Sequence, residues 1–314
     1  MKTVSSCPSC AGTASRCGRA LVAPFIAKRI WGRDPFEIAL MKCAGCGFYF
    51  FNPRLEPEEE TRLYTGYRGP EYQGMRQDFE PWYTPHFNQK ITDPDFLKLR
   101  KSKVSEILSE HLPNGKSLKI LDFGGAQGEL VKDLIPGALP YVYDVSGVQP
   151  LPGVRSCPDL NHCRSLESEL IISSNVLEHV GSPRSVVQQM RQVAASGTVL
   201  WVEVPHESPE GSPLILRRLI QEACLVLLRP RVALSLARPG ALHLMHEHVN
   251  FFNLQSLETL LRCSGWDVTD SGTYGLRGPL GQQEWVWALA KAGPSTDDRL
   301  APITTANFHP KNGA

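Results

Sequence analysis

One apolar run that ends in glycines constrains the fold of this chain more than any other stretch. Residues 119–123 (KILDF) are followed at once by 124–128 (GGAQG) and then by 129–134 (ELVKDL), which have a helix-like pattern. This order predicts a buried strand, a tight turn and the start of a helix. Gly124 and Gly128 allow the backbone to approach a ligand closely, and the unpaired N–H groups of a helix N-terminus face the space above the strand.

An acidic residue at the end of the next apolar run adds to this pattern. Residues 141–143 (YVY) are followed by Asp144, which lies 22 residues beyond Asp122. In a Rossmann-like unit, an acidic residue about 20 positions further on hydrogen-bonds the ribose hydroxyls of a nucleoside cofactor. A dinucleotide turn would have its third glycine where Glu129 stands. The stretch therefore favours a different nucleoside cofactor.

The pattern Asp122-x-Gly124-x-Ala126-x-Gly128 resembles motif I of class I S-adenosylmethionine-dependent methyltransferases, with Ala126 at the usual middle glycine. The resemblance implies an α/β fold with a doubly wound, Rossmann-like methyltransferase sheet. It also implies that S-adenosylmethionine is the cofactor. The expected cofactor-binding residues are Asp122, Gly124, Gly125, Gly128, Asp144 and Asn175.

Four of the nine cysteines form two closely spaced pairs, each followed by a glycine turn. The pairs are Cys7 with Cys10 and Cys43 with Cys46. In this pattern backbone N–H groups can point at the thiolates while four sulfurs surround one ion, so we expect one structural zinc in a small zinc-ribbon domain. Hairpin strands are expected at residues 20–30 and 37–41. Such a site folds its own ribbon, so zinc removal is expected to unfold the first ~50 residues and to leave cofactor binding intact. The alternative is two unrelated buried pairs.

Charge and composition divide the chain. Residues 1–55 carry eight Lys and Arg against two acids, whereas residues 56–80 carry seven acids against three arginines, which marks a boundary near residues 53–57. A length of 314 residues, 42% of them hydrophobic, is enough for about two domains with a real core. We expect a zinc-ribbon domain at 1–55, an aromatic-rich linker or lid at 56–92, a methyltransferase domain at 93–292 with an insert at 206–245, and a disordered tail at 293–314.

No stretch predicts export or a membrane span. The first residues lack an apolar core, no run reaches the ~18 apolar residues of a transmembrane helix, and an odd number of cysteines argues against a disulfide framework. We therefore expect a cytoplasmic protein. The positive charge of residues 1–55 would suit nucleic acid, but four thiolates offset it in part and residues 48–51 (FYFF) alternate like a core strand, so nucleic acid is not expected as a partner.

The rest of the chain alternates between strand and helix patterns, as a doubly wound sheet requires. A helix capped by Asp93 is expected to end before residues 113–115 (PNG). Further strands are expected at residues 153–156, 169–174, 198–204, 266–269 and 284–289. Further helices are expected at 183–195 and at 252–265, the second with Asn253 as its cap.

Four of the nine histidines follow predicted strands, at the edge where such sheets bind ligands. They are His179, His206, His246 and His248. A metal ion bound by His246 and His248 would need a third ligand, such as His206 or Glu203. The alternative is that these histidines satisfy backbone groups of loops.

The order of motifs resembles the zinc-ribbon methyltransferases of bacterial sugar pathways over residues 7–290. The resemblance rests on the paired cysteines, residues 52–54 (NPR), residues 177–179 (LEH) and a Glu-His pair before two aromatics. In the deoxysugar C-methyltransferases of that group, such a pair and a histidine after the fourth strand line the substrate site, which implies this role for Glu247, His248 and His179. Met245 stands where those enzymes have a tyrosine, and no counterpart of their additional C-terminal domain is expected.

These features predict methyl transfer from S-adenosylmethionine to a small, sugar-like or other polar metabolite, with removal of a proton from the acceptor. The imidazole of His248, with an unperturbed pKa of about 6.5, is expected to take this proton, while Glu247 orients it and His179 contacts the acceptor. An alternative is a non-catalytic zinc-ribbon adapter that binds protein or RNA.

Residues 213–238 are rich in arginine and have an amphipathic pattern. This segment is expected to be a lid over the acceptor, a site for an anionic substrate, or a membrane-surface contact. The last would make the chain a peripheral membrane methyltransferase with a lipid-linked acceptor. The sequence leaves the oligomeric state open.

Overall fold

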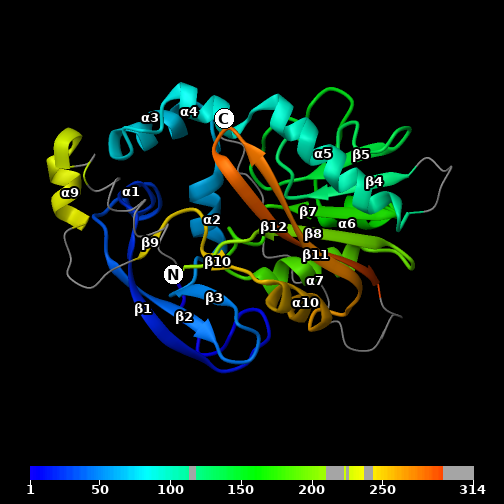
Figure 1. Ribbon diagram of the computed structural model, residues 1–314, viewed down its shortest axis with the longest axis horizontal. Helices are drawn as coiled ribbons and strands as arrows, with labels where there is room; N and C mark the ends of the chain where they lie inside the picture. The colour runs from blue at the N-terminus through cyan, green and yellow to red at the C-terminus, as the bar shows by residue number, and fades with distance from the viewer. Residues whose placement is uncertain (113–117, 210–222, 224–225, 237–242, 293–314) are drawn as a thin grey trace.

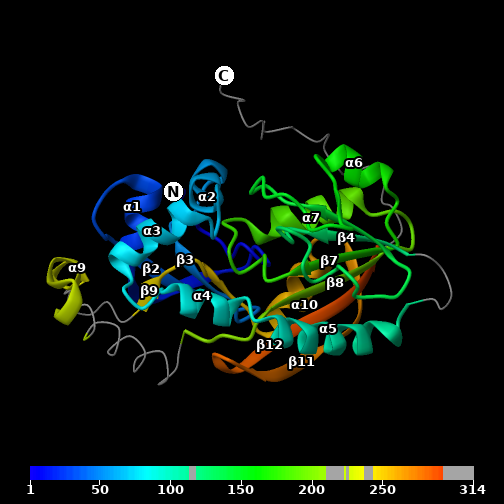
Figure 2. The same cartoon turned by 90° about the horizontal axis from the view of Figure 1, so that it is seen from above.

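The computed structural model describes residues 1–112, 118–209, 223, 226–236 and 243–292. They form two sheets that lie side by side with helices around them (Figure 1, Figure 2). None of the described helices is long and apolar enough to cross a membrane. The predicted tail at 293–314 lies outside the described residues.

The larger sheet has seven strands in the order β11-β12-β8-β7-β4-β5-β6, and β12 is antiparallel to both of its neighbours. The strands are β4 Lys119–Phe123, β5 Leu139–Tyr143, β6 Arg155–Ser156, β7 Leu170–Ser174, β8 Val199–Pro205, β11 Trp266–Gly278 and β12 Gly281–Ala292. This sheet confirms the predicted doubly wound fold. The closing pair, β11 and β12, is longer than the sequence pattern indicated. The strand order reverses between β4 and β7, which is where such sheets bind ligands.

Helices cover both faces of this sheet. They are α5 Pro94–Ser109, α6 Leu160–Ser165, α7 Pro183–Val193 and α10 Leu254–Arg262. On one face Leu108 of α5 packs in a cluster with Trp201, and on the other Val187 of α7 and Leu257 of α10 pack together. The predicted caps are present, since Asp93 caps α5 and the side chain of Asn253 caps α10.

The helix predicted over residues 129–134 does not form. The chain makes a series of turns there, and the α-type bond from Lys132 N to Gly128 O (3.1 Å) does not propagate. Gly128 has φ 76° and Asp133 has φ 59°. Left-handed residues interrupt a right-handed helix, which explains why the helix-like pattern fails at this point.

The smaller sheet has five strands in the order β10-β3-β2-β1-β9. They are β1 Ala14–Val22, β2 Glu37–Cys43, β3 Tyr49–Asn52, β9 His243–Met245 and β10 Asn250–Phe251. β9 pairs with β1 in parallel, and β10 pairs with β3 antiparallel. β9, at the end of the predicted insert, and β10, which follows it, therefore complete a sheet that begins in the predicted zinc ribbon.

The strand predicted over residues 20–30 is wrong in its second half. β1 ends at Val22, and α1 occupies Pro24–Trp31. Pro24 stands in the first helical turn and Gly32 ends the helix with φ 66°, and both residues are favourable at those positions. The apolar run that suggested a strand instead provides the buried face of this helix.

The aromatic-rich segment forms α2 Pro57–Tyr64, α3 Pro70–Phe79 and α4 Pro85–Ile91, and α9 covers Pro230–Leu236. α1 contacts α2, α3 and α9. Tyr72 of α3 and Leu63 of α2 are buried in one cluster with Phe25. The division of the chain at residues 55 and 92 stays a prediction.

One hydrophobic cluster spans both sheets. Phe48, beside β3, packs against Phe252 with ring centroids 4.7 Å apart, and Leu257 of α10 belongs to the same cluster. Cys7 and Cys43 are also buried in it. The region expected to be a separate ribbon therefore shares its core with the larger sheet.

Candidate active site and cysteine cluster

The turn after β4 leaves room for backbone alone at two positions. A Cβ atom built on Gly124 would lie 2.8 Å from Val176 Cγ2, and one built on Gly125 would lie 2.0 Å from the carboxyl carbon of Asp122. Ala126 has φ 50°, in the left-handed region that favours glycine. These close approaches give the turn the shape that a backbone cradle for a cofactor needs.

Two aspartates hold this turn. Asp144, at the carboxyl end of β5, accepts hydrogen bonds from Ala126 N (2.8 Å) and Ser146 N (2.7 Å). Asp122 is buried, and its Oδ2 has no hydrogen-bond partner among the described residues. Burial, followed by the nearby charge of Asp144, raises the pKa of Asp122 to about 8. Asp144 thus ties the turn to the neighbouring strand, while Asp122 lies against the backbone of Gly125.

A buried charged network lies at the carboxyl ends of β7 and β8. Arg100 of α5 donates to Ser174 Oγ (2.6 Å) and to Glu203 Oε1 (2.5 Å), and Tyr274 OH donates to Glu203 Oε2 (2.5 Å). Both oxygens of Glu203 are occupied, which removes it as the third ligand of a metal site. Neither Arg100 nor Tyr274 was expected here, because their partners are distant in sequence.

The loop after β7 joins the cofactor turn to the second part of the site. Asn175 directly follows β7 with φ 54°, and its side-chain oxygen accepts from Trp285 Nε1 (3.1 Å). Val176 packs against Gly124. His179 lies three residues further along the same loop.

Two histidines face each other beyond this loop. The rings of His179 and His248 lie edge to face with centroids 4.8 Å apart. Nδ1 of His179 lies 3.1 Å from Glu247 O, and Nδ1 of His248 lies 2.7 Å from Glu207 Oε2. In both rings Nε2 has no hydrogen-bond partner in the part of the chain that the structure describes. The carboxylate that orients His248 is thus Glu207, a residue that the sequence did not single out.

The environment gives the two imidazoles opposite charge states. Burial, and then the charge of His248, lower the pKa of His179 to about 3. Burial also opposes the charge of His248, but the carboxylates of Glu207 and Glu178 outweigh it and raise the pKa of His248 to about 9. This environment favours the charged imidazole of His248 at neutral pH, whereas the sequence led us to expect a neutral imidazole.

Glu247 belongs to a buried network with α3. Tyr72 OH and Arg76 Nη1 (3.1 Å) donate to its carboxylate, and Glu80 bonds both Arg76 Nε (2.7 Å) and His246. Burial alone would raise the pKa of Glu247, but His246, whose Nδ1 lies 3.6 Å from Glu247 Oε2, and the charge of Arg76 hold it well below its usual range. The available signal for this network was the four-residue spacing of Tyr72 and Arg76 on one face of α3 and of Glu80, which directly follows that helix.

Residues 96–271, more than half of the chain, match the family model described as a methyltransferase domain. The chain belongs to this methyltransferase family. The predictions of a class I S-adenosylmethionine-dependent methyltransferase, of its fold and of enzymatic activity are thereby confirmed. A comparison with curated proteins finds no match.

Several solved methyltransferases are similar to this chain in fold. The 1,6-didemethyltoxoflavin N1-methyltransferase of Burkholderia thailandensis is 16% identical, covers 82% of this chain and 96% of its own, and has a TM-score of 0.47. A methyltransferase of Methanosarcina mazei is 13% identical, with 60% and 98% covered and a TM-score of 0.41. One of Anabaena variabilis is also 13% identical, with 62% and 85% covered and a TM-score of 0.39.

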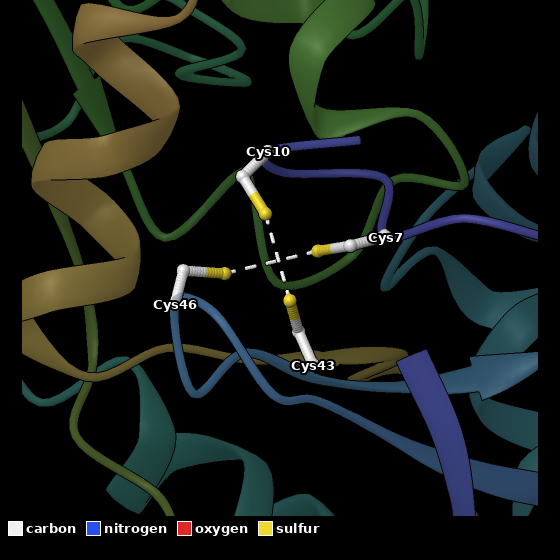
Figure 3. A group of neighbouring side chains, drawn as sticks. All are labelled: Cys7, Cys10, Cys43 and Cys46. Carbon is white, nitrogen blue, oxygen red and sulfur yellow. Dashed lines mark hydrogen bonds between the residues drawn. The ribbon is translucent and has the colours of Figure 1, made fainter. Parts of the chain in front are cut away.

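The methyltransferase also brings its four paired cysteines together. Their sulfur atoms point toward one centre (Figure 3), with Cys7 Sγ 3.8 Å from Cys46 Sγ and Cys10 Sγ 3.5 Å from Cys43 Sγ. Tetrahedral zinc with Zn–S bonds of about 2.3 Å places sulfurs about 3.8 Å apart, so the cluster fits this ion. Gly12 N donates to Cys10 Sγ (3.3 Å), as a thiolate site requires.

Two further predicted features lie apart from the histidine pair. His206 is exposed, with Nδ1 3.4 Å from Glu284 Oε2. Most of the arginine-rich segment lies outside the described residues, but Leu227, Leu228 and Leu234 are described and exposed.

Proposed function

We propose that this methyltransferase transfers the methyl group of S-adenosylmethionine to a small, polar, sugar-like acceptor that loses a proton during the reaction. The observation that carries this proposal is the His179–His248 pair, which offers two unoccupied Nε2 atoms beside the loop that packs on Gly124. The sulfonium already makes the methyl group electrophilic. The protein therefore has to position the acceptor and assist the removal of its proton.

We assign the proton-accepting role to His248. Its Nδ1 is held by the carboxylate of Glu207, an arrangement that orients an imidazole as a general base. The positive charge of the bound cofactor disfavours a second positive charge nearby and so favours the neutral imidazole. His179 is expected to contact the acceptor, and Glu247 to hold His179 through its carbonyl oxygen. Asp144 and the glycine turn are expected to bind the cofactor.

Incubation with labelled cofactor and candidate sugar nucleotides, followed by mass spectrometry, tests this function. Replacing His248 with Ala is expected to lower turnover by roughly two to four orders of magnitude and to leave S-adenosylhomocysteine affinity unchanged. His206→Ala is the matched control, because His206 is exposed at the same edge and lies outside the pair. Full turnover in His248→Ala together with loss in His179→Ala would move the base to His179. Full turnover in both variants would mean that neither imidazole acts as the base and that the protein assists the reaction by positioning alone.

The cysteine cluster is proposed to hold one structural zinc ion through Cys7, Cys10, Cys43 and Cys46. The spacing of its sulfurs and the glycine turns beside them support this assignment. The ion would supply no chemistry to the methyl transfer. It would instead fix the ends of β2 and the N-terminal loop against α10, where Gln255 Nε2 donates to Gly45 O (3.3 Å).

A peripheral membrane enzyme is the second candidate, because large apolar side chains are exposed beside arginines. Leu227, Leu228 and Leu234 are 82%, 56% and 75% exposed, and Arg229 and Arg231 lie between them in sequence. Such a surface suits an anionic bilayer. Co-sedimentation with anionic vesicles that high salt reverses would support it, and recovery of all protein in the supernatant at low salt would exclude it.

A further inference from the structure

We propose that Glu178, His179 and His248 form a binding site for one divalent first-row transition-metal ion. The site would lie beside the larger sheet, where the acceptor is proposed to bind. Each residue offers one ligand atom, and the three atoms lie within 4.8 Å of one another. Glu178 Oε1 is 3.7 Å from His179 Nε2. Two imidazoles and one carboxylate are a donor set that such ions prefer, and three protein ligands leave positions open for a substrate.

The carboxylate of Glu178 is the second observation that points to a cation. Its side chain is buried, with 2% of the residue exposed, and neither of its oxygens has a hydrogen-bond partner among the described residues. A buried carboxylate without a partner is costly, and a bound cation would remove that cost. The backbone oxygen of Glu178 accepts from Val249 N (2.8 Å), which fixes the residue beside His248.

The two imidazoles are already held as metal ligands are usually held. A ligating histidine commonly uses its other ring nitrogen for a hydrogen bond to a carboxylate or a backbone carbonyl. Here Nδ1 of His248 meets the carboxylate of Glu207, and Nδ1 of His179 meets the carbonyl of Glu247. Both Nε2 atoms are left for an ion.

Binding would need a small closure of the three side chains. Metal–ligand bonds of about 2.0 to 2.2 Å place the ligand atoms roughly 3 to 3.4 Å apart, so the widest separation would shrink by on the order of 1 Å. A bound ion would lower the pKa of a coordinated acceptor hydroxyl. This functional part rests on the proposed methyl transfer, and in the metal-bound state His248 acts as a ligand in place of a base, so the proton of the coordinated hydroxyl would pass to solvent water. Binding of the ion itself does not depend on the acceptor.

Titration of full-length protein that carries one zinc ion per chain with Co²⁺ by calorimetry, followed by elemental analysis, tests the site. We expect one Co²⁺ per chain in addition to the zinc of the cysteine cluster. Glu178→Gln and His248→Ala are expected to weaken Co²⁺ binding at least tenfold, whereas His206→Ala leaves it unchanged. S-adenosylhomocysteine affinity verifies that each variant is folded. No additional Co²⁺ in the wild-type protein, or equal binding in all variants, would overturn the site.

Turnover separates this inference from the proposed function. Protein that has been stripped of the second ion and retains its cysteine-bound zinc keeps His248 as its base and is expected to transfer methyl groups, and Co²⁺ is expected to raise this turnover by roughly tenfold or more. A turnover that Co²⁺ leaves unchanged would overturn the functional part and leave the proposed methyl transfer standing. Stoichiometric Co²⁺ binding without methylation of any acceptor would support the site and overturn the proposed function.

Discussion

Gly125→Ala isolates the steric demand of the cofactor turn. A Cβ atom on Gly125 would lie 2.0 Å from both Cγ and Oδ2 of Asp122 and 2.4 Å from Oδ1. Gly125 has no positive φ, so an alanine there adds a clash without a backbone penalty. The whole effect therefore measures how tightly the turn packs on the buried carboxyl.

The clash cannot be relieved by a small shift. Contacts below 3.0 Å are essentially absent between real Cβ atoms and their neighbours, so the carboxyl or the turn must move by about 1 Å or more. Asp122 is 1% exposed and stands on β4, an inner strand of the larger sheet, where little space is available. We expect a loss of about 2 to 3 kcal/mol of unfolding free energy, at the upper end of the range for overpacking. S-adenosylhomocysteine affinity should fall at least tenfold, about 1.4 kcal/mol, because the turn is displaced.

Urea unfolding and calorimetric titration with S-adenosylhomocysteine measure these effects. Gly74→Ala is the control, because Gly74 lies inside α3 and a Cβ atom there would meet no other atom within 4 Å, so alanine should stabilise by roughly 0.5 to 1 kcal/mol. The double variant Gly125→Ala/Asp122→Ala should lose less than the sum of its single variants, since the shorter side chain vacates the contested space. Additive losses, or wild-type affinity in Gly125→Ala, would refute the reasoning.

Three further changes test other parts of the molecule. A strong chelator is expected to lower the melting temperature of the whole chain and to weaken cofactor binding, because Cys43 shares a core with the larger sheet; an unchanged cofactor affinity would restore the idea of an independent ribbon. Burial raises the pKa of Glu60 from 4.5 to about 7, so its contribution to stability is fully present below about pH 4.5 and is lost as the pH rises through about 7. The unfolding free energy of Glu60→Gln, measured relative to that of the wild type by urea unfolding, should therefore rise by up to about 3 kcal/mol between pH 5 and pH 8. The same difference between variant and wild type at both pH values would contradict this. Asp144→Ala should abolish S-adenosylhomocysteine binding in calorimetry, because it removes the expected ribose acceptor and frees Ala126 N; undiminished binding would remove that role.

The cofactor half of the molecule was predictable because its signals are local. A buried strand that ends in a glycine turn needs no distant partner, and the strands and helix caps that follow carry their own patterns. The structure places β4, β7, β8 and the caps at Asp93 and Asn253 where the sequence indicated. The helix predicted after the turn does not form, because Gly128 and Asp133 have left-handed backbone conformations.

The histidine pair and the smaller sheet were less predictable, because their contacts join residues that are far apart in the sequence. His179 and His248 could be selected from their positions after strands, but Glu207 has no local signal that marks it as the partner of His248. The pairing of β9 with β1 and of β10 with β3 depends on segments that lie about 200 residues apart in the sequence. Local periodicity also assigned residues 24–30 to a strand, because an apolar run suits a buried helix equally well.

Arg54 shows why the histidine pair depends on the smaller sheet. Its buried guanidinium donates to Gly181 O (2.9 Å), two residues after His179, and to Val249 O (3.1 Å), next to His248. One side chain from the end of the predicted ribbon therefore fixes both loops that carry the pair. A chain without the ribbon would lose the group that sets the distance between the two imidazoles. The cysteine cluster and the acceptor edge are thus parts of one structure, because the sheet that the cysteines anchor is the sheet from which Arg54 reaches the site.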